Sequence, residues 1–470
     1  MIEKLIYFSP LAAIIIGVLC LLRGNRKDSE IRRCFHISRI SLVVSFLFSV
    51  IFFNRSVVES LTVGNHFTLL CISLMYIGSF LLMFFSEKWF LSMKISAKAF
   101  CINVLVAIAA GSLMISSVNL GLTLICVAIE LINSVFLLQI GQTKKYEGGR
   151  FYLYAVMFCI FLLVFAVFQL YHMDQTLFYE GLRQKIKLYQ NSGFTFISVA
   201  CIMIVLMFLI GFAPLHFWST ELLSSAILPI FTYFMLVPSV ACFAGLIHLN
   251  IYVFAPLLDK FAFFYTSVAL ISIGIGAIGS CSGQNIRKML AYSSLYHQAV
   301  VFLILQRFSL GSTVLSTAYY AIYLLTMYGI CACLFGLKVK GEYLFMVHEF
   351  NGAAHRRPYI SAMIVLFLFS LLGFPPLMGF LGTFTTLNDL VGHSHLYQAA
   401  YLCFMLLILS YSYLQLVRAI YFEEGKEVFD RADRSIYMVI FLNALIMILL
   451  VLQPHYLLNM LTGILGDVFV

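Results

Sequence analysis

Two ionisable residues lie inside apolar stretches of the sequence, where a charge is costly. Glu130 stands in the middle of LICVAIELINSVF, and His297 lies about two turns into the stretch that begins with NIRKML. A charged side chain at the centre of a membrane span costs about 3 kcal/mol, so such a residue is a functional candidate by default. A histidine can gain and lose a proton near neutral pH. We therefore predict Glu130 as a protonatable site of a proton path and His297 as a second one. The alternative for each is a neutral, hydrogen-bonded core residue.

Two basic residues stand at the start of the stretch that holds His297. Arg287 and Lys288 are further candidates for the proton path. Taken alone, basic residues at the end of a span are typical of charges that set membrane topology. The hydroxyls of Ser293 and Ser294 are expected to bond backbone carbonyls or neighbouring helices.

Two segments place prolines and glycines inside apolar sequence, which predicts broken helices. One apolar run stops at Gly211, and another is interrupted between Leu371 and Phe384. Lipid offers no partner for the backbone groups that a break frees, so a break is tolerated only inside protein or beside a water-filled path. Broken helices at corresponding positions are typical of transporters built from inverted repeats. The residues expected to shape the two breaks are Pro214, His216, Pro229, Pro238, Pro375 and Pro376.

The composition places these residues in a membrane. Hydrophobic residues make up 62% of the 470 residues, charged residues make up 10%, and the mean hydropathy is +1.01. Soluble domains carry about 25% charged residues, so a soluble protein is excluded. Apolar runs long enough to span a bilayer recur along the chain, and the alternating pattern of a barrel is absent. The predicted spans are 5–22, 34–53, 67–86, 99–117, 121–140, 151–172, 193–211, 228–249, 261–281, 288–306, 311–337, 358–382, 396–421 and 436–453.

The predicted fold is therefore an all-α polytopic membrane protein of about 14 helices. It is expected to contain two inverted five-helix repeats in which spans 7 and 12 are broken. No linker divides the chain, so we predict a single domain over residues 1–470. Its predicted parts are N-terminal helices over 1–118, a first repeat over 119–285, a second repeat over 286–453 and a tail over 454–470. The tail is expected to form an interfacial amphipathic helix.

The distribution of Lys and Arg supports an even number of spans. Of the 29 Lys and Arg, 22 fall in the loops after odd-numbered spans or in the residues that flank these loops, and 7 fall on the other side. The side rich in basic residues is expected to face the cytoplasm or matrix, with both termini on the opposite face. The net charge of +9 is thus explained by topology, and a nucleic-acid partner is not expected.

The sequence carries no pattern for bond chemistry. The 12 cysteines lie mostly in apolar segments and form no Cys-x-x-Cys pair, which argues against a metal or redox centre. His393 and His395 resemble a metal pair, but Asp389 is the one further potential ligand nearby, so a loop is predicted. Gly-rich nucleotide loops and catalytic triads are also absent. No cofactor is expected on this chain.

In chain order, the motifs resemble a known family. After Glu130 come APLHFW, LP…VPSVACFA, NIRKMLAYSSLYH and GFPPLMGFLGTF. This order resembles the antiporter-like membrane subunits of respiratory complex I, which share ancestry with Mrp-type cation/proton antiporters. Within that family the pattern is most similar to NADH dehydrogenase subunit 2, called subunit N in bacteria. The resemblance covers roughly residues 111–453.

The resemblance also reveals departures from the family pattern. The family's half-channel uses a glutamate on span 5, which corresponds to Glu130, and lysines on spans 7, 8 and 12. Those lysine positions are occupied here by Leu209, Ser239 and Thr383. In the family, such a Glu–Lys pair lets the position of one charge control the next. We therefore expect a neutral Glu130 and a proton path that is weakened or lost.

The resemblance implies a membrane-arm subunit of proton-translocating NADH:ubiquinone oxidoreductase, contributing to or scaffolding proton translocation. It implies that NADH, FMN, Fe–S clusters and ubiquinone belong to the whole complex, and that this chain has no redox centre. Its expected partners are other membrane-arm subunits and membrane lipids. An Mrp-type cation/proton antiporter subunit and a purely structural arm subunit are the alternatives. The 46 Phe and 26 Tyr favour a mitochondrial inner membrane over a bacterial plasma membrane, because they suggest an AT-rich gene.

Overall fold

The computed structural model describes residues 9–23, 30–51, 62, 64–140, 147–425 and 428–469. The start of the first predicted span, and several residues of the charge count such as Lys4 and Arg55, lie outside the described residues. The chain forms two compact units. Unit 1 comprises Met1–Ile210, Ala226–Phe261 and Asp467–Val470, and unit 2 comprises Gly211–Ser225 and Ala262–Gly466.

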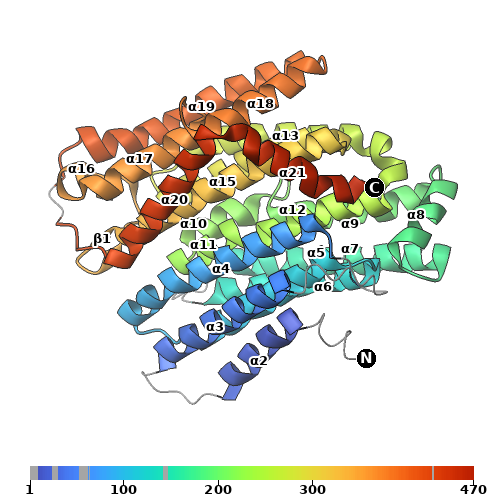
Figure 1. The fold of residues 1–470 in the computed structure, drawn as a ribbon, viewed down its shortest axis with the longest axis horizontal. Coiled ribbons are helices and arrows are strands. Elements are labelled where there is room, and N and C mark those ends of the chain that lie inside the picture. The colour runs from blue at the N-terminus through green and yellow to red at the C-terminus, as the bar shows by residue number, and fades with distance from the viewer. Residues whose placement is uncertain are drawn as a thin grey trace. The chain divides into compact units, whose positions relative to one another are not determined.

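Unit 1 is helical in its described residues. Its helices are α2 (Ser9–Arg23), α3 (Glu30–Ile51), α4 (His66–Met93), α5 (Lys98–Ser116), α6 (Leu120–Gln139), α7 (Glu147–Asp174), α8 (Tyr179–Leu188), α9 (Gly193–Ile210), α11 (Leu228–Leu236), α12 (Pro238–His248), η2 (Leu249–Val253) and η3 (Ala255–Leu257). In this unit α3 packs against both α2 and α4 (Figure 1).

Unit 2 holds the remaining helices and one small hairpin. Its elements are η1 (Trp218–Leu222), α10 (Leu223–Ser225), most of α13 (Leu258–Cys281), α14 (Ile286–Ile304), η4 (Leu305–Arg307), α15 (Leu310–Gly336), β1 (Lys338–Val339), β2 (Glu342–Tyr343), η5 (Val347–Phe350), α16 (Ala353–Arg356), α17 (Pro358–Leu372), α18 (Met378–Gly392), α19 (Leu396–Phe422), α20 (Arg434–Leu452) and most of α21 (Pro454–Phe469). The two strands pair antiparallel, with Lys338 opposite Tyr343.

The helices confirm an all-α polytopic membrane protein. In the described part of the chain, 12 helices are long and apolar enough to cross a membrane, and Pro10–Arg23 and Pro358–Leu372 are shorter apolar helices. The count of 14 spans and the inverted relation of the repeats stay predictions. One boundary was wrong: span 12 was predicted to end at residue 382, but after the break the helix resumes as α18 and continues to Gly392. The Gly/Pro cluster interrupts this helix without ending it.

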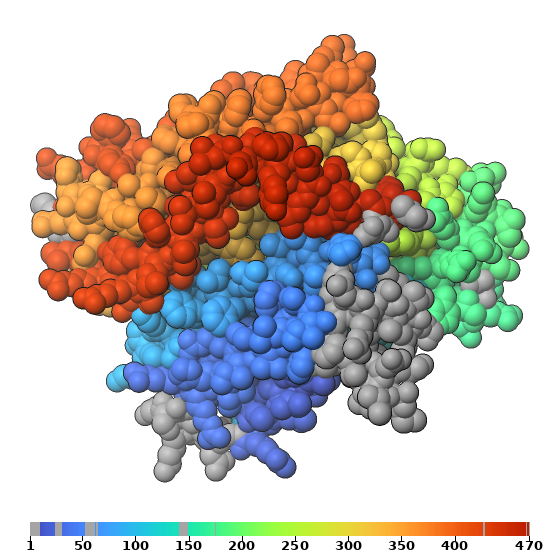
Figure 2. All heavy atoms as spheres, in the orientation of Figure 1, coloured from blue at the N-terminus to red at the C-terminus, as the bar shows by residue number. Residues whose placement is uncertain are grey.

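The core of each unit lies around its apolar, well-packed helices. In unit 1 every residue of the most apolar part of Leu228–Val253 is buried. In the most apolar part of Gly149–Met173, 28% of the residues are buried. Exposed aromatic residues such as Phe151 and Phe161 cover the outer face of α7, as expected for a helix that faces lipid. In unit 2, α20 and α21 lie on the visible surface (Figure 2) and likewise expose apolar side chains.

Close helix packing explains the glycines of α13. A Cβ atom on Gly276 would lie 2.7 Å from the backbone nitrogen of Tyr296 on α14 and 2.8 Å from the carbonyl oxygen of Tyr292. Cβ atoms on Gly274 and Gly279 would likewise overlap tyrosine side chains. Only glycine lets the two backbones approach this closely.

The same local devices occur in both of the predicted repeats. Gly-Phe-x-Pro-Leu stands at residues 211–215 and again at 373–377. The glycine has a positive φ at both places, +89° at Gly211 and +71° at Gly373. An asparagine caps each helix that carries a candidate residue. Asn119 caps α6, which holds Glu130, and Asn285 caps α14, which holds His297. These parallels support the predicted repeats.

Candidate proton-handling site

Glu130 lies on α6 and is buried in unit 1. Its side chain is 2% exposed. The hydroxyl of Tyr233 on α11 donates a hydrogen bond to Glu130 Oε2 over 3.3 Å. Among the described residues this is the side-chain partner of the carboxyl group, and no ion pair reaches it. Burial without a cation disfavours the charged form of a carboxyl group, so a neutral Glu130 stays the prediction.

A glycine of α5 leaves room for the Glu130 carboxyl group. A Cβ atom on Gly111 would lie 3.4 Å from Glu130 Oε1 and 2.9 Å from the sulfur of Met75. Nearby polar groups bond to one another: Asn133 Nδ2 donates to the carbonyl oxygen of Asn103 at 2.9 Å. Glu130 is therefore held in a tight and largely apolar site.

The three positions that carry lysine in the antiporter-like family are buried in this chain and hold uncharged residues. Leu209 is 4% exposed, and Ser239 and Thr383 are each 7% exposed. The Ser239 hydroxyl donates to the Met235 carbonyl oxygen at 3.2 Å. The Thr383 hydroxyl donates to the carbonyl oxygen of Phe380 at 3.1 Å. The two hydroxyls are uncharged and bond to their own helices, and leucine has no ionisable group. None of the three side chains therefore supplies a cation.

The first break separates α9 from η1. The amide of Ala213 is freed there, and it donates to the Ser272 hydroxyl on α13 at 3.0 Å within unit 2. The Ser219 hydroxyl donates back to the carbonyl oxygen of His216 at 2.8 Å. As membrane burial demands, protein groups satisfy the freed backbone. Pro229 and Pro238 follow at the first turns of α11 and α12, where proline is tolerated.

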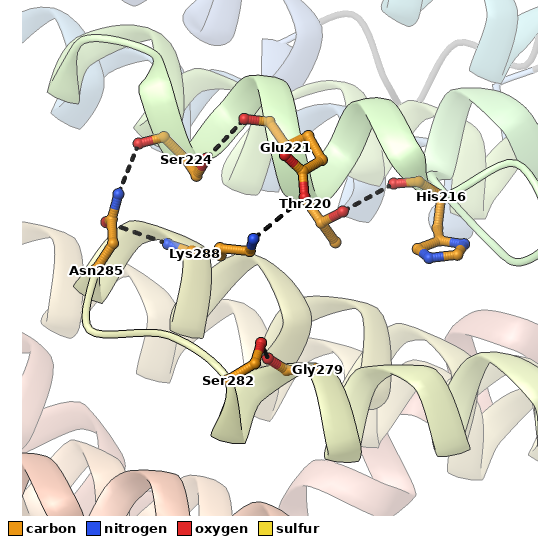
Figure 3. Close-up of polar contacts among 8 residues, drawn as sticks. All are labelled: His216, Thr220, Glu221, Ser224, Gly279, Ser282, Asn285 and Lys288. Atoms are coloured by element: carbon orange, nitrogen blue, oxygen red, sulfur yellow. Dashed lines mark hydrogen bonds and ion pairs between the residues drawn. The ribbon is translucent and has the colours of Figure 1, made fainter.

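His216 is half-buried at this break (Figure 3). Its ring stacks on Phe217, with the ring centres 4.7 Å apart. Its carbonyl oxygen accepts hydrogen bonds from the residues of η1, which continues the chain as a π-helical turn. His216 therefore lies at the predicted break, and its role in shaping the break stays a prediction.

Lys288 and Asn285 bind the second half of the broken helix to the start of α14. Lys288 Nζ lies 3.1 Å from Glu221 Oε1, and Asn285 Nδ2 donates to the Ser224 carbonyl oxygen at 3.1 Å (Figure 3). Arg287 lies over the ring of Phe345, 4.8 Å from its centre. Lys288 precedes His297 by nine residues, about 13 Å along the helix. The basic pair therefore holds elements together, and its predicted part in a proton path stays a prediction.

His297 lies on α14 inside a hydrogen-bonded cluster of unit 2. Its side chain is 1% exposed. Nδ1 lies 3.0 Å from the hydroxyl of Tyr319, and Nε2 lies 3.3 Å from the hydroxyl of Tyr413. The Tyr413 hydroxyl also bonds to Ser293, and the ring of Tyr323 stacks on His297 at 5.6 Å. Both ring nitrogens thus have a partner that can give or take a proton.

The second break, between α17 and α18, lies beside this cluster. The amide of Gly379 donates to the Ser370 hydroxyl at 3.2 Å. Residues of the break and of the cluster together line a pocket of about 10 Å³. It is lined by His297, Tyr319, Ile322, Tyr323, Thr326, Ser370, Leu371, Gly379 and Gly382. His297, Pro375 and Pro376, which the sequence singled out separately, therefore belong to one region of unit 2.

Sequence reasoning missed several polar partners. Tyr233, Tyr319 and Tyr413 were overlooked because tyrosine is common in the chain and its hydroxyl carries no charge. His248 is 3% exposed, and its ring lies 5.6 Å from that of Phe67. It could have been found by the same search for ionisable residues within spans. The pair Arg39–Glu87, with 2.5 Å between its charged atoms, could also have been found, since opposite charges in consecutive spans suggest a partnership.

The His393–His395 segment forms the turn between α18 and α19. His393 Nδ1 lies 3.3 Å from Asp389 Oδ1, one turn earlier in the chain. Among the described residues no group of three or more His, Cys, Asp and Glu side chains is placed to hold a metal ion. The predicted loop is confirmed.

Comparison with known proteins reveals relatives along most of the chain. The family model described as NADH:quinone oxidoreductase/Mrp antiporter, transmembrane, matches residues 110–410. NADH-quinone oxidoreductase subunit N of Beijerinckia indica is 23% identical over 462 residues, which are 96% of this chain and 94% of that protein. Subunit N of Pelagibacter ubique is 27% identical over 246 residues, which are 52% of each chain.

Solved structures show the same fold. A chain of the membrane-bound sulfane sulfur reductase, an archaeal respiratory membrane complex, matches with a TM-score of 0.84 at 16% identity, covering 100% of this chain and 97% of its own. A chain of the Mrp complex from a Dietzia species has a TM-score of 0.84 at 12% identity, covering 100% and 98%. A chain of respiratory complex I from Thermus thermophilus has a TM-score of 0.78 at 16% identity, covering 96% and 98%. At these identities the likeness shows the fold alone.

Proposed function

Because this chain belongs to the NADH:quinone oxidoreductase/Mrp antiporter transmembrane family, we propose that it is the antiporter-like subunit N of a proton-translocating NADH:quinone oxidoreductase. The observation that carries the proposal is the nearly full-length match with a protein named subunit N, over 96% of this chain and 94% of that protein. As a multi-pass membrane protein, the chain would form part of the membrane arm of that complex.

We further propose that the lysine-based proton path of this subunit is weakened or lost. Glu130 is retained and buried, with Tyr233 as its hydrogen-bond partner. Leu209, Ser239 and Thr383 cannot hold a proton as a lysine does, so these three positions supply no cation that could shift the ionisation of a neighbouring group. The subunit would then contribute to proton translocation through Glu130 and His297, or would hold neighbouring subunits in place.

The redox chemistry is assigned to other subunits in this proposal. NADH, FMN, the Fe–S clusters and ubiquinone would bind elsewhere in the complex, and this chain would bind none of them. Its partners would be other membrane-arm subunits and membrane lipids, which the exposed apolar faces of α7, α19 and α20 suit. Placement in the mitochondrial inner membrane rests on composition, and the bacterial plasma membrane is the alternative. Both termini would face the intermembrane space or periplasm.

One second function has a specific observation in its favour. The description of the family whose model matches residues 110–410 names the Mrp antiporter beside NADH:quinone oxidoreductase. An isolated cation/proton antiporter would nevertheless need its own ion path, and the neutral residues at the three lysine positions argue against one. A purely structural arm subunit agrees equally with those residues.

The test is to identify what co-migrates with this chain. The membranes are extracted with a mild detergent, complexes are separated by native electrophoresis, and the band is analysed by mass spectrometry. Recovery with flavin-binding, iron–sulfur and other antiporter-like subunits is the expected result. Recovery alone, or only with small Mrp-type partners, would overturn the assignment.

A further inference from the structure

The short helix α8 (Tyr179–Leu188) carries an excess of positive charge at the surface of unit 1. It holds Arg183, Lys185 and Lys187 but one acidic residue, Glu180. Arg183 and Lys187 are exposed, and Lys185 is half-buried. In the part of the chain that the structure describes, none of these three basic side chains takes part in an ion pair. Their charge is therefore available to an anion from outside the chain.

Membrane topology does not account for this cluster. In the predicted topology, α8 follows span 6 and lies on the side that is poor in basic residues. Four of the 7 basic residues on that side fall in α8 or beside it, namely Arg183, Lys185, Lys187 and Lys260. Charges that only set topology are expected on the opposite side, so this cluster needs another explanation.

The inner face of α8 is fixed to unit 1. Tyr179, Leu182 and Ile186 share one face of the helix and are at most 5% exposed. The hydroxyl of Tyr179 bonds to that of Thr123 over 2.6 Å, and its amide donates to the Val118 carbonyl oxygen at 3.0 Å. The helix also packs against η2 and η3 of the same unit. The basic side chains thus project from an anchored helix.

Lys260 holds the chain that follows α8. Its Nζ donates to the carbonyl oxygen of Gln190 at 2.7 Å and to Asn191 Oδ1 at 2.8 Å. The amide of Tyr189 donates to the carbonyl oxygen of Lys185 at 2.9 Å, which closes the last turn. Both ends of α8 are therefore tied to unit 1, and an anion would meet side chains that are already in position.

The preceding helix, α7, shows where lipid lies next to α8. Large apolar and aromatic side chains that are at least 52% exposed recur along one stripe of α7: Tyr154, Met157, Phe158, Phe161, Val164, Phe168 and Tyr171. From Tyr154 to Tyr171 the stripe extends about 26 Å, close to the thickness of the hydrocarbon core. It ends with a tyrosine, which is typical of the membrane surface. Because α8 packs against α7 (Figure 1), lipid headgroups at this end lie near α8.

We propose that α8 binds the phosphate of an anionic phospholipid whose acyl chains lie along the stripe of α7. Arg183 and Lys187 are four residues apart on one side of the helix, so both can reach the same headgroup. The guanidinium group can pair with two phosphate oxygens, and the ammonium group adds a point charge. This inference rests on the membrane placement within the proposed function, and it adds the class of lipid and the site.

The first test identifies what lies against α8 in the native membrane. The photoreactive amino acid p-benzoylphenylalanine is introduced at Leu188, which is 76% exposed and follows Lys187. After illumination the complex is purified, and the adducts on this chain are identified by mass spectrometry. We expect adducts with phosphatidylglycerol or cardiolipin to be enriched above the share of these lipids in the whole membrane.

The second test removes the charges from α8. Arg183→Gln combined with Lys187→Gln should lower the enrichment about fivefold for each charge removed. Arg183→Lys keeps the charge but loses the paired geometry, so it should lower the enrichment less than Arg183→Gln does. Lys340→Gln combined with Arg356→Gln is the matched control, because it removes two exposed charges elsewhere in the chain and should leave the enrichment unchanged.

Three results would overturn the lipid site. The first is a set of adducts that follows the composition of the whole membrane, or that is the same in wild type and in the Arg183→Gln, Lys187→Gln variant. The second is an adduct with another protein, which would show that a neighbouring subunit covers α8. The third is loss of the lipid adducts on addition of inorganic phosphate, which would identify a soluble anion as the ligand.

The test of the site can be separated from the test of the proposed function. A chain that assembles with complex I subunits but shows no enrichment of anionic lipid would lose the site and keep its subunit assignment. A chain that is recovered alone but shows the enrichment would keep the site, and the proposed function would fail.

Discussion

Tyr233 and Glu130 are joined by a hydrogen bond inside unit 1, although 103 residues separate them in the chain. The hydroxyl of Tyr233 donates to the buried carboxyl group over 3.3 Å. Because no ion pair reaches Glu130 among the described residues, this bond decides how the carboxyl group is held. A buried, charged carboxylate would need a cation beside it, and here the uncharged hydroxyl of Tyr233 takes that place.

Removing this hydroxyl should leave Glu130 without its partner. We expect Tyr233→Phe to destabilise the protein by about 1–3 kcal/mol, the cost of an unsatisfied buried polar group. The infrared carbonyl band of protonated Glu130 should move to higher frequency, and Glu130→Gln should abolish it. Tyr154→Phe on the exposed face of α7 is the control. An unchanged band in Tyr233→Phe would contradict the hydrogen bond.

The first break should depend on the serine that satisfies its backbone. Ser272→Ala removes the acceptor for the Ala213 amide, whose bond measures 3.0 Å. A freed amide at membrane depth has no water to bond, so we expect a loss of about 1–3 kcal/mol in thermal unfolding in detergent. Ser267→Ala on the same helix removes a bond only to its own helix and should cost less than half as much. Equal losses in both variants would show that the break is satisfied in another way.

Close packing of α13 against α14 should not tolerate a methyl group. In Gly276→Ala the new Cβ atom would lie 2.7 Å from the Tyr296 backbone nitrogen, and a backbone cannot turn aside as a side chain can. Overpacking of this kind costs about 1–3 kcal/mol or more. We expect a lower unfolding temperature and less assembled complex on native gels. Gly311→Ala meets nothing within 4 Å and should match wild type in both measurements.

The turn between α18 and α19 should respond to acid through His395. Partial burial lowers the pKa of His395 below its usual value, and the positive charge of Arg307 adds to this effect. The folded state therefore binds this proton less readily than the unfolded state, and the stability contribution is complete above the unfolded pKa of about 6.5. It is lost as the pH falls below that value. His395→Gln should reduce the loss of stability between about pH 7 and pH 5, and an identical pH profile in both proteins would contradict it.

The sequence predicted those features that depend on local chemistry. Helices that cross lipid need long apolar runs, and prolines without N–H groups interrupt helices wherever they stand, so both the all-α fold and the two breaks were predictable. The end of span 12 was misplaced because a Gly/Pro cluster does not reveal whether the helix resumes after it. Glu130 and His297 were found because ionisable residues inside apolar runs stand out. Their roles in proton transfer stay predictions.

Tertiary structure alone decided which groups meet. Tyr413 reaches His297 across 116 residues, and Tyr233 reaches Glu130 across 103. No local pattern distinguishes these tyrosines from the others among the 26 in the chain, because a hydroxyl at a buried position becomes informative only when its partner is known. The sequence determined that this is a helical membrane protein with two interrupted spans and few charges. Packing determined that tyrosine hydroxyl groups contact Glu130 and His297, since long-range contacts depend on how helices pack and not on the order of residues within them.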